Sequence, residues 1–155
     1  MIEPNELAHR CAATLYARDA ASQHLGITIS GVAPGQATAR MRITETMLNG
    51  HGVAHGGYLF LLADTAFAFA CNSRGPVTVA AGAEMVFVTP ATLGDELVAT
   101  ATERVRYGRS GVSDVTVHRA DGTVIAEFRG RSRSRTGSVL DATPPAGVHA
   151  DPPSG

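Results

Sequence analysis

The chain of 155 residues contains no lysine, so all 13 of its basic side chains are arginines. Without lysine, Schiff-base chemistry on the protein and the phosphate-binding lysine of a P-loop are excluded. Cysteine is scarce as well, with only Cys11 and Cys71 present. Two cysteines do not make a disulfide framework, and Cys71 falls in an apolar stretch typical of a buried thiol. We therefore expect a reducing compartment, the cytoplasm.

An excess of one charge is also lacking, because 14 acidic residues balance the 13 arginines. Neither a nucleic acid nor a membrane surface is therefore expected as a partner. Residues 1–10 have no basic start and no long apolar run, so no signal peptide is expected. The most apolar stretch is shorter than the roughly 20 residues that span a bilayer.

Several catalytic motifs are missing. The chain has no Gly-x-Ser-x-Gly elbow, no glycine-rich dinucleotide fingerprint and no cysteine placed as a nucleophile after a turn. His51 and His55 are four residues apart, but the other histidines are scattered and no cysteine pair accompanies them. We therefore expect no metal site and no cofactor.

The spacing of apolar residues predicts one α+β domain over residues 1–135. A helical pattern covers residues 4–24, and Gly26 ends it. Strand patterns follow at residues 27–29, 37–43, 77–88, 97–107, 111–119 and 123–135, with turns at Pro34-Gly35 and Asp121-Gly122. An apolar helix is predicted to begin between residues 54 and 57 and to end near Asn72. Residues 136–155 have no periodicity and are expected to form a disordered tail.

The central helix is apolar on nearly every side, so it must be covered all round. A curved antiparallel sheet of five or six strands, wrapped around the helix, buries it. Such a sheet does not close and leaves edge strands to be protected, which two copies of the chain can do by joining their sheets. Dimerisation is therefore expected.

The most informative stretch is a glycine-rich turn leading into this helix, Leu48-Asn49-Gly50-His51-Gly52-Val53-Ala54-His55-Gly56-Gly57-Tyr58-Leu59-Phe60-Leu61-Leu62-Ala63-Asp64. Burial raises the pKa of a carboxylate towards the range of a general base, so Asp64 is a candidate catalytic group; capping or salt bridging is the alternative. The N–H groups of Gly56 and Gly57, at the positive end of the helix dipole, could bind an oxyanion, although the two glycines can also serve only a turn. Together these features favour acyl-transfer hydrolysis.

The spacing of these groups predicts a site between subunits. Asp64 lies eight residues beyond Gly56, which is roughly 12 Å along a helix. A base or nucleophile must act within about 3.5 Å of the reacting carbon, so one helix cannot supply both groups to one substrate. Two antiparallel copies can, with the turn of one subunit facing Asp64 of the other.

Other candidates have less specific signals. Asn49 either forms a turn with Gly50 or orients water or a carbonyl. Tyr58, Phe60 and Phe67 are candidate walls of an acyl pocket, and core packing is an equal alternative for the two phenylalanines. Four arginines share one face of the last strand and either keep it solvated or bind phosphates: Arg129, Arg131, Arg133 and Arg135. The turn Arg109-Ser110-Gly111 is a weaker candidate of the same kind.

The motif around residues 47–57, together with Leu62-Ala63-Asp64-Thr65-Ala66-Phe67-Ala68 and Ala70-Cys71-Asn72-Ser73, resembles the hotdog-fold thioesterases of the PaaI type. Further similarity lies in residues 19–27, 87–90, 94–97, 111–112 and 128–132, so the resemblance covers about residues 15–137. It implies hydrolysis of acyl-coenzyme A thioesters, aromatic ones of the hydroxyphenylacetyl kind, and a tetramer made of two dimers.

Carried over by position, Asp64 matches the catalytic carboxylate, Gly56 matches the backbone donor, and Asn49 and His55 match supporting polar residues. Family members often carry Ser or Thr on the strand facing the site, followed by Phe-Leu-Arg-Pro. This chain instead reads Ala83-Glu84-Met85-Val86-Phe87-Val88-Thr89-Pro90. Two alternatives remain open: a hotdog protein that binds acyl-coenzyme A without cleaving it, and a hydratase or dehydratase of the same fold.

Overall fold

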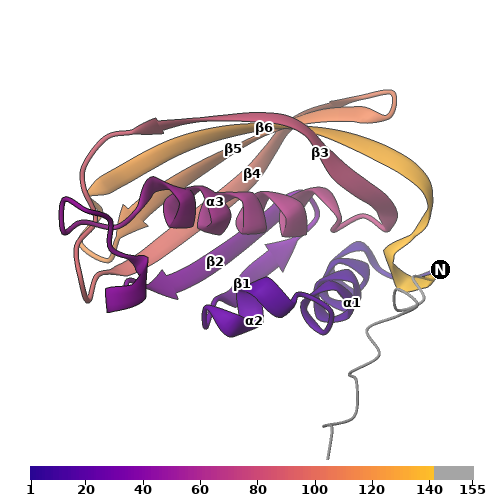
Figure 1. Ribbon diagram of the computed structural model, residues 1–155. Helices are drawn as coiled ribbons and strands as arrows, with labels where there is room; N and C mark the ends of the chain where they lie inside the picture. Colours follow the sequence, from indigo (N-terminus) through magenta and orange to yellow (C-terminus); the bar gives the residue numbers. More distant parts are fainter. Residues whose placement is uncertain (142–155) are drawn as a thin grey trace, which may run out of the picture.

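The computed structural model describes residues 1–141 of the chain (Figure 1). In these residues the chain forms, in order, α1 (Pro4–Tyr16), α2 (Ala20–His24), β1 (Thr28–Ala33), β2 (Gln36–Arg42), η1 (Glu45–Met47), α3 (Gly56–Cys71), β3 (Pro76–Phe87), β4 (Glu96–Tyr107), β5 (Ser110–Arg119), β6 (Val124–Ser138) and η2 (Val139–Asp141). Each predicted strand and the central helix are confirmed to within a few residues.

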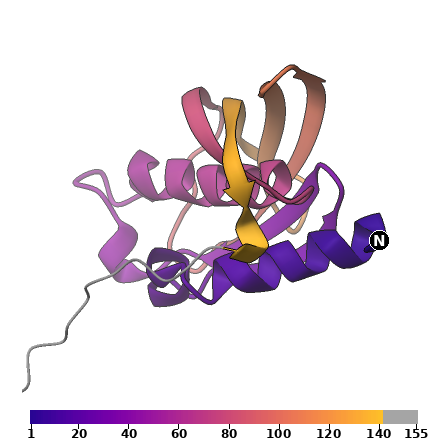
Figure 2. The same cartoon turned by 90° about the vertical axis from the view of Figure 1, so that its right-hand side faces the viewer.

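The six strands make one sheet in the order β1-β2-β4-β5-β6-β3, with every neighbouring pair antiparallel. The sheet curves around α3, which lies along its inner side (Figures 1 and 2). Helix α1 packs against β1 and η2. This is the predicted α+β fold, with β1 and β3 as the two edge strands.

Small side chains on the inner side of the sheet let it approach α3 closely. The side chains of β2 alternate, and Ala37, Ala39 and Met41 are buried beneath the helix. On β6, a Cβ atom at Gly130 would lie only 2.7 Å from the ring of Phe67, so this strand touches the helix where a side chain is missing. Burial of a phenylalanine such as Phe67 contributes about 1.5–3 kcal/mol.

The predicted helix over residues 4–24 is in fact two helices. Asp19 interrupts it because its carboxylate caps α2, accepting the backbone N–H of Ser22 at 2.9 Å and the hydroxyl of the same residue at 2.6 Å. Tyr16 then donates its hydroxyl to the carbonyl of Ile27 at 2.8 Å, which ties the end of α1 to the start of the sheet. Gly26 ends the helical segment, as predicted, with a φ of 69°.

The expectation of a disordered tail from residue 136 is wrong for its first six residues. Strand β6 continues to Ser138, which pairs with Pro76 of β3, and η2 follows directly. Val139 anchors this end because its side chain is buried and its N–H donates to the carbonyl of Gly75 at 2.7 Å. The rest of the expected tail lies outside the described residues.

One side of α3 is not covered by the chain's own sheet. Phe60, Leu61, Asp64 and Ala68 lie on this side at helical spacing, and each is half-buried or exposed. We call these four residues the uncovered face of α3. The neighbouring edge strand β3 also exposes apolar side chains, among them Val79 and Phe87. Within residues 1–141, no helix has both the length and the apolar character needed to cross a membrane.

Candidate active site

Asn49 closes the loop that leads into α3. Its side-chain Oδ1 accepts the backbone N–H groups of His51 at 2.9 Å and Val53 at 3.3 Å. Its own backbone N–H donates to the carbonyl of Val53 at 2.8 Å. Asn49 therefore does form the turn that the sequence predicted. Because the oxygen is used in the turn, the side-chain Nδ2 is left as the donor that can act on a ligand.

His55 is the N-cap residue of α3. Its imidazole Nδ1 accepts the N–H of Gly57 at 2.9 Å, and its carbonyl accepts the N–H of Tyr58 at 3.0 Å. In the described part of the chain, the N–H of Gly56 has no acceptor. Of the two glycine amides expected to bind an oxyanion, only that of Gly56 is therefore free among the described residues. The Gly57 amide is held by His55, and the Gly56 amide is the free donor.

A pocket of about 510 Å³ opens beside this free amide. Its lining consists of Asn49, Val53, Ala54, Gly56, Leu59, Phe87, Val88, Thr89 and Pro90. The Phe87 ring lies so close that a Cβ atom at Gly56 would be 2.9 Å from its Cζ. A Cβ atom at this position would therefore displace the Phe87 ring, and glycine lets the ring and the amide share the mouth of the pocket.

Phe87 is a site residue that reasoning from the sequence missed. It ends β3 and pairs with Ala126 of β6, whose side chain is buried, so Phe87 points to the inner side of the sheet. Its position just before Val88-Thr89-Pro90 could have indicated this role, because an inward-facing aromatic residue at the end of a strand lies at the open end of the sheet. Only the structure shows that it meets Gly56.

Asp64 lies two turns further along α3, in the middle of the uncovered face. Its side chain is half-buried, and burial raises its pKa above the ordinary value. The described residues offer it neither an ion-pair partner nor a hydrogen-bond donor. Among residues 1–141, the capping or salt-bridge alternative for Asp64 therefore has no partner residue.

Gly56 and Asp64 belong to one uninterrupted helix, as the geometric argument required. Eight residues at 1.5 Å each separate them by roughly 12 Å along its axis. The pocket beside Gly56 contains no carboxylate, because neither Asp64 nor any other acidic residue lines it. One chain therefore presents an oxyanion donor and a desolvated carboxylate, but not to the same bound molecule.

The three aromatic candidates on α3 have different surroundings. Phe67 is a core residue, 1% exposed and packed on Phe128 at 5.7 Å between ring centroids, so the core alternative holds for it. Phe60 is 36% exposed and also contacts Phe128. Tyr58 lies edge-on to His55, 6.4 Å between centroids. It lines a separate pocket of about 440 Å³ with Thr46, Leu48, His55, Gly57 and Leu61.

The four arginines of β6 do share an exposed face, as predicted. Arg129 is not free, because it makes a bidentate contact with Asp114 at 2.7 and 2.9 Å, and this lowers the pKa of the Asp114 carboxyl. Arg133 donates to the hydroxyl of Ser110 at 3.3 Å. Arg131 lies over β3, where a Cβ at Gly82 would be 2.7 Å from its Nη2.

The turn between β4 and β5 carries the other candidates for binding substrate. Arg109 borders a pocket of about 340 Å³ together with Pro76, Arg106, Gly108, Ser134, Arg135 and Thr136. Gly111, in contrast, is buried, and a Cβ there would be 2.7 Å from the hydroxyl of Ser132. Within one chain this turn is far from Gly56, because about 26 Å of β3 separates Val79, which pairs with Arg133, from Phe87.

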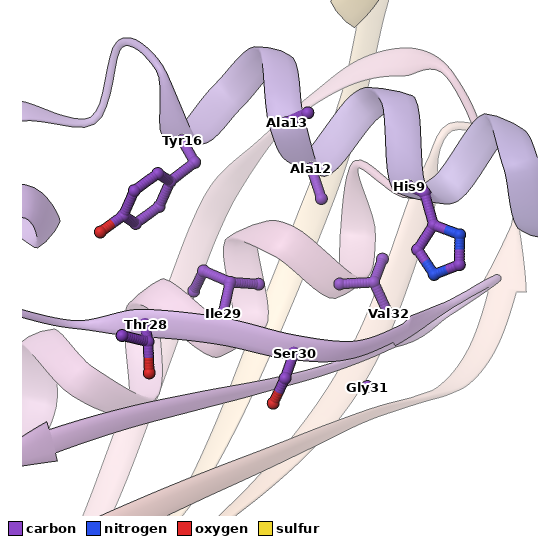
Figure 3. A pocket seen from close by; sticks show the side chains of 9 residues that line it. All are labelled: His9, Ala12, Ala13, Tyr16, Thr28, Ile29, Ser30, Gly31 and Val32. Carbon is purple, nitrogen blue, oxygen red and sulfur yellow. The ribbon is translucent and has the colours of Figure 1, made fainter.

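A further pocket of about 450 Å³ lies between α1 and β1 (Figure 3). It is lined by His9, Ala12, Ala13, Tyr16, Thr28, Ile29, Ser30, Gly31 and Val32. None of the residues predicted to act on a substrate lies there, and its lining contains neither a carboxylate nor an arginine.

Comparison with known proteins places these features in a family. Residues 51–126 match the family described as the thioesterase superfamily. The chain is 42% identical over 128 residues to the acyl-coenzyme A thioesterase PaaI of Escherichia coli K12, covering 83% of this chain and 91% of that protein.

Solved structures agree with this similarity. The PaaI protein from the phenylacetic acid degradation operon of Escherichia coli superposes with a TM-score of 0.86 and 40% identity, covering 88% of this chain and 99% of that one. A substituted form of the phenylacetic acid degradation protein PaaI of Thermus thermophilus superposes with a TM-score of 0.69 and 36% identity, covering 72% and 96%. The chain therefore belongs to the thioesterase superfamily and, within it, to the PaaI-type acyl-coenzyme A thioesterases of the hotdog fold.

Proposed function

We propose that this thioesterase hydrolyses acyl-coenzyme A to the free acid and coenzyme A in a site shared by two subunits. The observation that carries the proposal is the arrangement on α3, where a free amide at Gly56 and a desolvated carboxylate at Asp64 are too far apart to meet in one chain. The names of the similar proteins supply the substrate class, since the Escherichia coli relative is an acyl-coenzyme A thioesterase.

In the proposed reaction, the thioester carbonyl oxygen accepts the Gly56 N–H of one subunit. Asp64 of the other subunit removes a proton from water, whose oxygen attacks the carbonyl carbon. The C–S bond then breaks, and the thiolate leaves and takes up the proton. In the alternative reaction, the Asp64 carboxylate attacks the carbonyl carbon directly and the thiolate leaves. Water then hydrolyses the mixed anhydride and regenerates the carboxylate. A raised pKa suits both a base and a proton carrier.

The uncovered face of α3 supports a dimer in which two such helices run antiparallel. This face carries Asp64 among apolar side chains, and β3 beside it is an edge strand with free backbone groups. A second copy placed there would bring its Gly56 towards Asp64. Two dimers then form the tetramer that the resemblance implies.

We propose aromatic acyl groups of the hydroxyphenylacetyl kind, in phenylacetate degradation within the cytoplasm. Two similar proteins are named for phenylacetic acid degradation. The pocket beside Gly56 has room for a ring, and Phe87 and Leu59 give it apolar walls. Asn49 would orient the thioester through its free Nδ2, and Tyr58 borders the neighbouring pocket.

For the coenzyme A phosphates, we propose Arg109 and Arg131, with Ser110 beside them. These residues lie at the far end of the sheet from the Gly56 of their own chain. In an antiparallel dimer they would approach the Gly56 of the partner. Arginines suit this task because their planar guanidinium groups bind phosphate in a bidentate way.

The test is release of free thiol from a panel of aliphatic and aromatic acyl-coenzyme A thioesters, with wild type and the Asp64→Asn variant. Asparagine keeps the shape and removes the base, so we expect kcat to fall by about 100-fold or more. Asp121→Asn makes the same chemical change in an exposed turn and should leave activity within about twofold.

The same assay separates the rival functions. Turnover of Asp64→Asn within about tenfold of wild type would remove Asp64 from the mechanism. Binding of acyl-coenzyme A by wild type without thiol release would favour the non-catalytic protein. A change in double-bond absorbance without thiol release would favour a hydratase or dehydratase.

A further inference from the structure

We infer that His55 is a positioning residue whose neutral imidazole fixes the start of α3, so that protonating this one side chain disables the anion site at Gly56. The inference rests on the proposed function, because it assigns the Gly56 amide to the thioester oxygen. It adds a dependence on pH that comes from the helix cap and is separate from the titration of Asp64.

The hydrogen bond at the cap requires one tautomer of the neutral His55 ring. The Gly57 N–H can donate only to a nitrogen with a free lone pair, so Nδ1 carries no proton and the neutral ring bears its proton on Nε2. N-cap positions are usually occupied by Ser, Thr, Asp or Asn, whose oxygens remain acceptors through the neutral range. This chain instead has an acceptor that is lost on protonation.

Protonation of His55 would destabilise the start of α3 in two ways. It removes the acceptor of the Gly57 N–H, and it places a positive charge at the positive end of the helix dipole. Gly56 stands between the cap and Gly57, so its amide direction depends on this turn keeping its shape. An oxyanion donor is effective only when it is held in place before the reaction.

The titratable groups that face the imidazole of His55 come from the elements packed against it. The pocket beside it is lined by Thr46 and Leu48 next to η1 and by Gly57, Tyr58 and Leu61 of α3, of which only Tyr58 is titratable. The other titratable groups on the elements packed around it are Glu45 of η1, His51 of the loop, and Asp64 and Cys71 of α3. No salt bridge joins His55 to any of them among residues 1–141.

The test compares the pH profiles of kcat and kcat/KM for wild type, His55→Asn and His51→Asn. Asparagine at position 55 can accept the Gly57 N–H at every pH in the range. His51→Asn is the matched control, because that exposed histidine lies in the same loop and bonds through its backbone.

In wild type, activity requires an ionised Asp64 and a neutral His55, so the acid limb of log(kcat/KM) should be steeper than a slope of one. Between pH 7.5 and 5.5, the range in which histidines titrate, we expect wild type and His51→Asn to lose about fivefold to tenfold more activity than His55→Asn. The loss should appear in kcat, because the amide acts on the transition state. Equal acid limbs in wild type and His55→Asn would overturn the inference.

A second measurement keeps the inference testable apart from catalysis. Amide hydrogen exchange of Gly57, corrected for the intrinsic effect of pH, should become less protected between pH 7.5 and 5.5 in wild type but not in His55→Asn. Unchanged protection in wild type would contradict the inference even in an active enzyme. Wild type that releases no thiol at any pH would instead contradict the proposed function, and the exchange result would still decide the role of His55.

Discussion

Burial of the Asp64 carboxylate without a partner raises its pKa, so the folded chain binds this proton more tightly than the unfolded chain does. In the unfolded chain an aspartate titrates near pH 3.9. As pH rises through that value and on to the higher folded-state value, the folded protein loses stability relative to a variant that cannot ionise. Above both values the loss is complete and constant.

Asp64→Asn should therefore raise the melting temperature at pH 7 while it lowers kcat by about 100-fold or more. The gain should shrink as pH is lowered towards 4, where both side chains are neutral. Calorimetric melts of the two proteins at pH 4, 5.5 and 7 measure the difference. An Asn variant that melts below wild type at pH 7 would show that the charge stabilises the fold.

Single residues of the site differ in how far the sequence revealed them. Asp64 could be identified from the sequence because a carboxylate in an apolar helix is costly to bury unless it is paired or functional. The sequence could not show that the Gly57 amide is bonded while the Gly56 amide is free, because this depends on which N–H the imidazole of His55 accepts. Phe87 contacts Gly56 across 31 positions of sequence, and periodicity does not predict such a contact.

At the scale of the helix, Gly56 occupies the first position of α3, where proline is well tolerated because its N–H is not needed by the helix. His55 already has the extended conformation that a residue before proline requires, with φ −63° and ψ 131°. Gly56→Pro therefore removes the proposed oxyanion donor while leaving the helix intact. We expect kcat to fall by about 100-fold to 1,000-fold.

Gly56→Ala is the matched control for this change. Both substitutions place a Cβ atom against the far end of the Phe87 ring, but alanine keeps the N–H. The ratio of kcat between the Ala and Pro variants therefore compares two proteins that share the Cβ contact and differ in the amide and in the proline ring. Thermal melts of both proteins check that the helix forms. Equal activity of the two variants would remove the Gly56 amide from the mechanism.

Most helices and strands could be predicted from the sequence because the period of the apolar residues and the turn residues indicated the same boundaries. The turns at Gly35 and Gly122 have the positive φ that glycine supplies, 74° and 88°. The misjudged elements lacked that agreement. Asp19 broke a continuous helical pattern by capping, and β6 extended past its alternating segment because β3 offered a pairing partner as far as Pro76.

For the whole molecule, the described chain leaves the α3 helix covered by sheet except along one side. That side carries Asp64 among Phe60, Leu61 and Ala68, and β3 beside it is an open edge. Unprotected edges and exposed apolar residues are features that folded proteins cover, commonly with a second copy. The fold therefore presents its carboxylate on the surface where a partner is expected.

A shared site makes a specific prediction for mixed subunits. Asp64→Asn lacks the base and Gly56→Pro lacks the amide, so each variant is inactive as a homodimer. In a mixed dimer of antiparallel helices, one site receives both defects and the other receives none. Co-refolding equal amounts gives mixed dimers in half of the population, each with one intact site of two. Thiol release should therefore recover to about one quarter of the wild-type value.

If Gly56 and Asp64 acted within one chain, every site in the mixture would keep a defect. The mixture would then be no more active than its parents.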